Sequence, residues 1–155
     1  MQHPSLPSSR SWSLDSLPPD ERRRVLDMAV SLKQTAQSGH PLQALRGKNL
    51  AVLCESPDCP ELESLRRAAG ALGARVTHVR PSEALVPTTS GPDAVGSLLG
   101  RLYDAIDCHG LAPEVVERLA RSTGRPVFNE LAGQSNVRSP ADDFTLQALL
   151  LSAVT

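Results

Sequence analysis

Apolar residues recur at helical spacing in five segments of the chain. The first begins at Pro18 and ends at Gly39, with Val25, Ala29 and Leu32 on one helical face. Proline suits the first turn of a helix because the first backbone N–H groups have no partner within the helix, and glycine commonly follows the last turn. The same signals predict four more helices, at residues 60–73, 92–102, 113–124 and 144–154.

Short apolar runs of strand length separate these helices. They lie at residues 49–55, 75–79, 103–108 and 125–128. Strands that alternate with crossover helices form a parallel sheet whose two faces are both covered. The pattern therefore predicts an α/β fold, a three-layer sandwich with a four-stranded parallel sheet flanked by about five helices.

The two ends of this pattern suggest the domain boundaries. Residues 1–17 are rich in Ser and Pro and show no periodicity, which predicts a mobile tail. We expect Trp12 to be a local anchor on the domain surface; the alternative is a partner-binding peptide. Residues 18–155 are expected to form one domain, because 155 residues suffice for a single core of ordinary size. Loops are expected at 81–91 and 129–143.

Composition and charge narrow the functional classes. The formal net charge of -1 provides no basic field for nucleic acid or for an anionic membrane surface. No stretch of 18 apolar residues and no signal peptide are visible, and the three cysteines form no disulfide framework. We therefore expect a cytoplasmic protein with reduced thiols and without nucleic-acid or membrane partners.

The stretch CESPDCPELESL, residues 54–65, lies where a strand leads into a helix. Parallel folds often bind phosphate at such a helix N-terminus. Here Pro60 removes one N–H donor, while Asp58, Glu61 and Glu63 already occupy the positive end of the helix dipole. We therefore predict an ordinary capped helix start and do not expect it to bind a small anion.

Cysteine and histidine residues offer alternative chemistry. Cys59, near a helix N-terminus, is a candidate reactive thiol, although the neighbouring acids oppose a thiolate, and Cys54 is predicted to be core. Cys54, Cys59, Cys108 and His109 do not have a recognised zinc spacing, so neither a metal nor a cofactor is expected. We expect His109 to be a solvent-facing loop residue; the alternative is that it lines the crevice at the carboxyl edge of the sheet.

Several segments together resemble one enzyme family. They are ALRGKNLAVL, GALGARVTHV, LLGRLYDAIDCHG and RPVFNEL. In this order they are similar to the amino-terminal, carbamoyl-phosphate-binding half of the ornithine/aspartate carbamoyltransferases, and PVFN is closer to the ornithine branch. The resemblance runs from about Pro18 to the last residues and implies the family's fold and, by analogy, a trimeric assembly.

The resemblance also identifies the positions of the family's site. The phosphate-binding Ser-Thr-Arg-Thr-Arg motif corresponds to Asp58, Cys59, Pro60, Glu61 and Leu62, so its arginines and hydroxyls are replaced. The carbamoyl-binding His-Pro-Thr-Gln motif corresponds to Asn136, Val137, Arg138 and Ser139. Arg101 alone matches a phosphate-binding arginine. The resemblance thus implies a degenerate site with no catalytic residue.

We therefore expect a non-catalytic interaction or regulatory module that binds a protein partner or further copies of itself. In the family a second domain binds the amino-acid substrate, and we expect no such site in these 155 residues. The alternative is a subunit that contributes to ornithine carbamoyltransferase activity within a complex.

Two structural expectations follow from this interpretation. The last helix, with Leu146, Leu149, Leu150 and Val154, should either fold back onto its own sheet or contact another chain. Arg101 should form an ion pair with Asp58 or Glu61.

Overall fold

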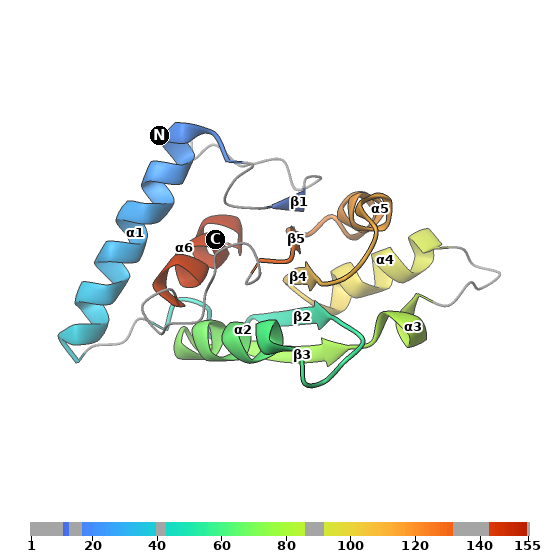
Figure 1. Ribbon diagram of the computed structural model, residues 1–155, viewed down its shortest axis with the longest axis horizontal. Helices are drawn as coiled ribbons and strands as arrows, with labels where there is room; N and C mark the ends of the chain where they lie inside the picture. The colour runs from blue at the N-terminus through green and yellow to red at the C-terminus, as the bar shows by residue number, and fades with distance from the viewer. Residues whose placement is uncertain (1–10, 13–16, 40–42, 86–91, 132–142, 155) are drawn as a thin grey trace.

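The computed structural model of the protein describes residues 11–12, 17–39, 43–85, 92–131 and 143–154. One all-parallel sheet runs through the middle of the molecule (Figure 1), with the strand order β1-β5-β4-β2-β3. Its strands are β1 (Ser11–Trp12), β2 (Asn49–Leu53), β3 (Arg75–Val79), β4 (Ala105–Cys108) and β5 (Val127–Asn129).

The four predicted strands are confirmed, and their register explains the buried centre of the sheet. Leu50 lies opposite Val76 on one side and Ala105 on the other, so β2 is paired along both edges. β1 is a short additional strand that pairs with β5 and that apolar periodicity did not indicate. It falls in the segment assigned to a tail, as does Leu17, whose side chain is only 6% exposed.

The five predicted helices are present, together with a short sixth. They are α1 (Pro19–Gln37), α2 (Pro60–Ala71), α3 (Pro81–Ala84), α4 (Pro92–Leu102), α5 (Pro113–Thr123) and α6 (Asp143–Val154). α3 lies in a segment predicted to be a loop. The Glu55 carboxylate accepts hydrogen bonds from the Ser82 N–H at 2.6 Å and the Ser82 hydroxyl at 2.8 Å. A contact from a distant part of the chain thus supplies the acceptor that the first turn of this helix needs.

Helices cover both faces of the sheet, which confirms the three-layer α/β fold. Side chains of a strand point alternately to the two faces. Leu50 and Val52 pack in the cluster that includes residues of α1, α2 and α6, whereas Ala51 and Leu53 pack with residues of α4 and α5. β2 is therefore apolar throughout because neither of its faces meets water.

The last helix folds back onto its own domain. α6 packs against α1 and α2, and Leu146, Leu149 and Leu150 are each at most 2% exposed, while Val154 is partly buried. Two hydrogen bonds join the Arg67 guanidinium to the Asp143 carboxylate, at 2.6 and 2.9 Å. Of the two alternatives for this helix, burial within the chain is the one observed.

On the other face, α4 and α5 approach each other very closely. A Cβ atom added at Gly100 would lie 2.1 Å from the carbonyl oxygen of Thr123, and one added at Gly96 would lie 1.8 Å from the Ser122 hydroxyl. The two glycines of α4 therefore form a surface onto which α5 fits. No helix in the described ranges is long and apolar enough to cross a membrane.

Candidate functional site

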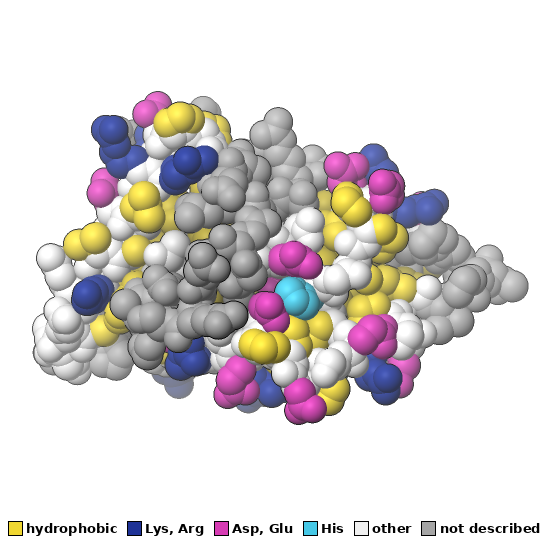
Figure 2. Space-filling view, viewed as in Figure 1, with side chains coloured by type: hydrophobic (Ala, Val, Ile, Leu, Met, Phe, Trp, Pro, Cys, Tyr) yellow, Lys and Arg dark blue, Asp and Glu magenta, His cyan; other side chains and the backbone are white. Residues whose placement is uncertain are grey.

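The carboxyl ends of three parallel strands bring polar side chains together. β2 leads through a loop to α2, whose N-cap is Cys59 and whose first turn contains Glu61. His109 follows β4 directly, and Glu130 follows β5. Because β4 lies between β2 and β5, His109 is the central residue of this group. Figure 2 shows a histidine flanked by acidic side chains on this face of the molecule.

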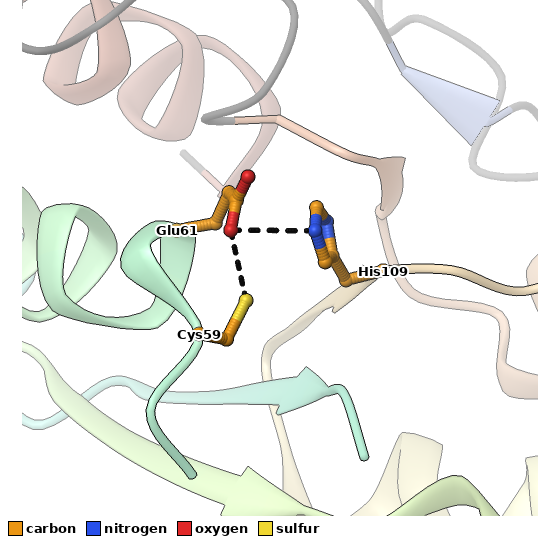
Figure 3. A group of neighbouring side chains, drawn as sticks. All are labelled: Cys59, Glu61 and His109. Atoms are coloured by element: carbon orange, nitrogen blue, oxygen red, sulfur yellow. Dashed lines mark hydrogen bonds and ion pairs between the residues drawn. The ribbon is translucent and has the colours of Figure 1, made fainter. Parts of the chain in front are cut away.

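Cys59, Glu61 and His109 form a compact cluster (Figure 3). The Cys59 thiol donates a hydrogen bond to Glu61 Oε2 at 2.9 Å. His109 Nε2 lies 3.3 Å from the same carboxylate oxygen. The Glu61 and His109 side chains are 25% and 22% exposed, so the cluster is partly shielded from water but can be reached by it.

The thiol and the carboxylate shift each other's titration in opposite directions. Burial raises the pKa of the Cys59 thiol, and its hydrogen bond to Glu61 raises it further. That same hydrogen bond lowers the pKa of Glu61. In the free protein the pair is therefore a neutral thiol that donates to an ionised carboxylate, and Cys59 is not an activated nucleophile.

His109 is a partly buried member of this cluster, so the expectation of a solvent-facing loop histidine was wrong. Its Nδ1 atom is buried without a hydrogen-bond partner and lies 4.0 Å from Glu130 Oε1. The same Glu130 oxygen accepts a hydrogen bond from the Gly110 N–H at 3.3 Å. Sequence spacing could not predict the contact between His109 and Glu130. It arises because β4 and β5 pair in parallel, which brings the residues that follow these strands together.

Asp107 lies under this group as a buried carboxyl that the sequence analysis did not single out. Its side chain is 3% exposed, and its Oδ1 accepts a hydrogen bond from the Leu131 N–H at 3.1 Å. Burial raises the pKa of Asp107 to about 7, and the charges of Glu130 and Glu61 act in the same direction. Asp107 lies in the predicted strand YDAIDC, residues 103–108. The sequence of this strand does not indicate that its second aspartate is buried.

The two other cysteines belong to the core. Cys54 and Cys108 are 2% and 0% exposed, which confirms the expectation for Cys54. Burial raises the pKa of the Cys54 thiol to about 11 and that of Cys108 to about 12. Of the residues considered together as a possible zinc set, the structure thus brings only Cys59 and His109 into one ligand cluster, and it adds Glu61.

Arg101 does not take part in the site. It lies exposed in the last turn of α4, and it forms no ion pair or hydrogen bond with Asp58 or Glu61, all three of which are described. The predicted ion pair was therefore wrong. Glu61 has His109 and Cys59 as its partners instead, because the end of β4 lies beside the start of α2 whereas α4 packs against α5 on the other face of the sheet.

The remaining predicted positions fall into two groups. Asp58 and Pro60 are exposed in the turn before α2, where the Asp58 N–H donates to the Ser56 hydroxyl at 3.2 Å. The stretch that corresponds to the carbamoyl-binding motif lies outside the described residues; it comprises Asn136, Val137, Arg138 and Ser139.

The sequence and the fold of the chain are both similar to those of ornithine carbamoyltransferases. No family model matches the chain. The catabolic ornithine carbamoyltransferase of Pseudomonas putida is 34% identical to it over 114 residues, which make up 74% of this chain and 34% of that protein. The chain thus spans about a third of the length of this curated relative.

Solved structures show the same fold. The ornithine carbamoyltransferase of Pyrococcus furiosus superimposes with a TM-score of 0.66 and 25% identity, over 76% of this chain and 37% of the other. The catalytic subunit of the M. jannaschii aspartate transcarbamoylase gives a TM-score of 0.66 with 19% identity, over 81% and 41%. Sequence and fold together show that the chain belongs to the ornithine/aspartate carbamoyltransferase family and spans only part of the length of its relatives.

Proposed function

We propose that this chain is a non-catalytic carbamoyltransferase-family module that acts by binding a protein partner or further copies of itself. The observation behind this proposal is the acidic side chain at the α2 N-terminus, where no side chain caps the helix through a hydrogen bond. Glu61 lies in its first turn and interacts with both Cys59 and His109. An ionised carboxylate about 5 Å from a phosphate would oppose each unit of its charge by roughly 3 kcal/mol at an effective dielectric constant near 20.

Exposed apolar side chains support the interaction role. Leu98 and Leu102 are each 55% exposed, one turn apart on α4, and Val30 on α1 is 57% exposed. Apolar side chains that recur at helical spacing on a surface are typical of protein contacts. The α6 helix, in contrast, offers no such surface, because its leucines are already buried.

A thermal-shift measurement with carbamoyl phosphate tests the loss of ligand binding. A ligand at 100 times its dissociation constant would add about 2.7 kcal/mol of stability. We expect no shift in the presence of a chelator that removes adventitious metals. A clear, saturable shift would contradict the proposal and support the alternative, in which the chain contributes carbamoyl phosphate binding to an ornithine carbamoyltransferase complex, in keeping with its curated relative.

Light scattering on the purified chain tests the association. We expect a molar mass that rises with concentration and that Leu98→Glu returns to the monomer value, since a buried charge at a contact is costly. Ser97→Glu, an exposed neighbour on the same helix, serves as the matched control. A monomer at tens of micromolar that also cross-links to no protein of its host would refute the interaction role.

A further inference from the structure

We propose that Cys59, Glu61 and His109 form a three-ligand site for a zinc ion, with a fourth coordination position open to water or to an external ligand. The three ligand atoms are the Cys59 Sγ, a Glu61 carboxylate oxygen and a His109 ring nitrogen, and all lie within 4.8 Å of one another. They come from two separate elements, the start of α2 and the loop after β4. The inference does not rest on the proposed function, since it concerns a cation and not a phosphate.

The chemistry of the three donors selects the metal. Thiolate and imidazole ligands favour zinc over magnesium or calcium, which prefer oxygen ligands alone. Three protein ligands of the Cys, His and carboxylate type, with a fourth position open, are typical of zinc sites that bind an exchangeable group. Glu61 and His109 are partly exposed, so solvent reaches the side chains that would hold the metal.

The distances fit a tetrahedral site after small side-chain movements. With usual zinc–ligand bond lengths, ligand atoms of a tetrahedral site lie about 3.3–3.6 Å apart. Glu61 Oε2 is 3.3 Å from His109 Nε2 and 2.9 Å from the Cys59 Sγ. Figure 3 shows the three side chains converging on one another. The remaining pair, the Cys59 Sγ and a His109 ring nitrogen, lies within 4.8 Å, so side-chain rotation is the movement that would bring all three ligand atoms to tetrahedral distances.

Glu130 completes the arrangement as a positioning residue. A zinc-bound histidine usually donates its second ring N–H to a carboxylate or carbonyl, which orients the ring. His109 Nδ1 is buried without a hydrogen-bond partner, and Glu130 Oε1 lies 4.0 Å from it, held by the Gly110 N–H. A small closure of this gap would let Nδ1–H donate to Glu130 while Nε2 faces the metal.

Metal binding at this site requires one proton to leave. The S–H bond of Cys59 now points at the Glu61 carboxylate. On binding, that bond breaks, its electron pair becomes the metal–sulfur bond and the proton passes to solvent. Glu61 and the neutral form of His109 bind a metal through lone pairs, so the step needs neither an oxidant nor a reductant.

Titration of the tag-free chain with Zn²⁺ and Co²⁺ tests the site. We expect one equivalent of either metal to bind, and the cobalt form to show intense visible bands of a tetrahedral ion together with a thiolate-to-cobalt charge-transfer band. Cys59→Ser and His109→Gln should each weaken binding at least 100-fold, and Glu130→Gln by about 10–100-fold. Glu63→Gln, an exposed acid of the same helix, should leave the affinity unchanged.

A second measurement uses the unmodified chain and so does not depend on the folding of variants. Cys59 is the only cysteine that is not buried, so it should react first with a thiol reagent, and stoichiometric Zn²⁺ should slow that reaction. The absence of stoichiometric binding, binding that survives loss of Cys59 or His109, or a thiol that zinc does not protect would each overturn the proposal. A negative carbamoyl phosphate result leaves these outcomes unaffected, since that experiment is done with a chelator.

Discussion

The two helix layers that cover the sheet are held by different kinds of contact. On the α4–α5 side, the closest approach is between backbones, at Gly100 and Thr123. On the side of α1, α2 and α6, polar side chains reach into the interface: Asp143 binds Arg67, and the Gln147 side-chain amide donates to the Ala68 carbonyl at 3.1 Å. The close contact between α4 and α5 thus depends on the absence of side chains at Gly96 and Gly100, whereas the other layer depends on polar groups matched within the interface.

This difference has a physical consequence. Contacts between backbones are insensitive to pH and tolerate no added atom. Buried polar groups are costly when unpaired, so each must keep its partner and its charge state. The same sheet therefore carries one layer that an added atom can disrupt and one layer that a change of protonation state can disrupt, and mutations can separate the two effects.

The largest expected effect concerns Asp107, whose side chain points to the polar layer. Burial raises the pKa of Asp107 from its ordinary value of 3.8 to about 7, so between these pH values the folded state holds a proton that the unfolded chain loses. The contribution of Asp107 to the free energy of unfolding should therefore be greatest below about pH 4, fall by about 4 kcal/mol as the pH rises to about 7, and then level off. The lowered pKa values of Glu55 and Glu61 act in the opposite direction, since their contributions are lost as the pH falls. Urea denaturation at a series of pH values measures this loss.

Asp107→Asn removes the ionisable group and keeps the oxygen that accepts the Leu131 N–H. We expect this variant to show a much smaller decrease in stability between pH 4 and pH 7 than the wild-type chain. If both proteins follow the same pH profile, Asp107 does not titrate as its burial implies.

The next largest effect should come from Gly100→Ala in the steric layer. The added Cβ would meet the Thr123 carbonyl carbon and oxygen at 2.9 and 2.1 Å, so the two helices must move apart. We expect the free energy of unfolding to fall by about 2–3 kcal/mol at every pH, as measured by chemical denaturation.

Gly70→Ala provides the matched control for this substitution. Gly70 is exposed in α2, and nothing lies within 4 Å of its added Cβ. The change should raise stability by about 0.5–1 kcal/mol, since alanine favours a helix more than glycine does. Equal effects of the two substitutions would show that α4 and α5 are not in close contact.

A smaller effect is expected for Asp143→Ala, which breaks the ion pair between α6 and α2. Asp143 is 10% exposed in its side chain, but Arg67 is 46% exposed, so water screens the pair. We expect the free energy of unfolding to fall by about 1 kcal/mol, because the change also removes a favourable charge at the start of α6.

Asp93→Ala is the matched substitution on α4. Asp93 lies 3.5 Å from Arg118, and both side chains are largely exposed, so the change in melting temperature should be smaller. The reverse order would contradict the assignment of α6 to the polar layer.

The smallest effect should be that of Arg101→Ala. The Arg101 side chain is exposed on α4 and takes part in the contacts of neither layer. The free energy of unfolding should therefore change by no more than about 0.5 kcal/mol, which a melting curve can measure. Arg125→Ala is the informative comparison, because the Arg125 Nε–H donates to the Gly100 carbonyl at 3.0 Å and thus holds the end of α4. A larger effect at Arg101 than at Arg125 would show that Arg101 has a partner in solution.

The sequence by itself determined the fold class and most of the secondary structure, with the exception of β1 and α3. Apolar runs of strand length set β2 to β5, and prolines at the first turns set the starts of α2, α4 and α5, because such signals act within a few residues of the chain. The resemblance to carbamoyltransferases was also visible in the residues and agrees with the comparisons. The short helix α3 escaped detection because its acceptor, Glu55, comes from another loop.

Only the tertiary structure decided which groups meet at the carboxyl edge of the sheet. Glu61 and His109 lie far apart in sequence and come together because β2 and β4 pair in parallel, which places the residues that follow both strands at the same edge. The packing of α4 against α5 likewise places Arg101 away from the site. Burial of the Asp107 side chain raises its pKa. Distances between side chains and the burial of each side chain depend on how the whole chain packs. Neither can therefore be predicted from a local pattern of residues.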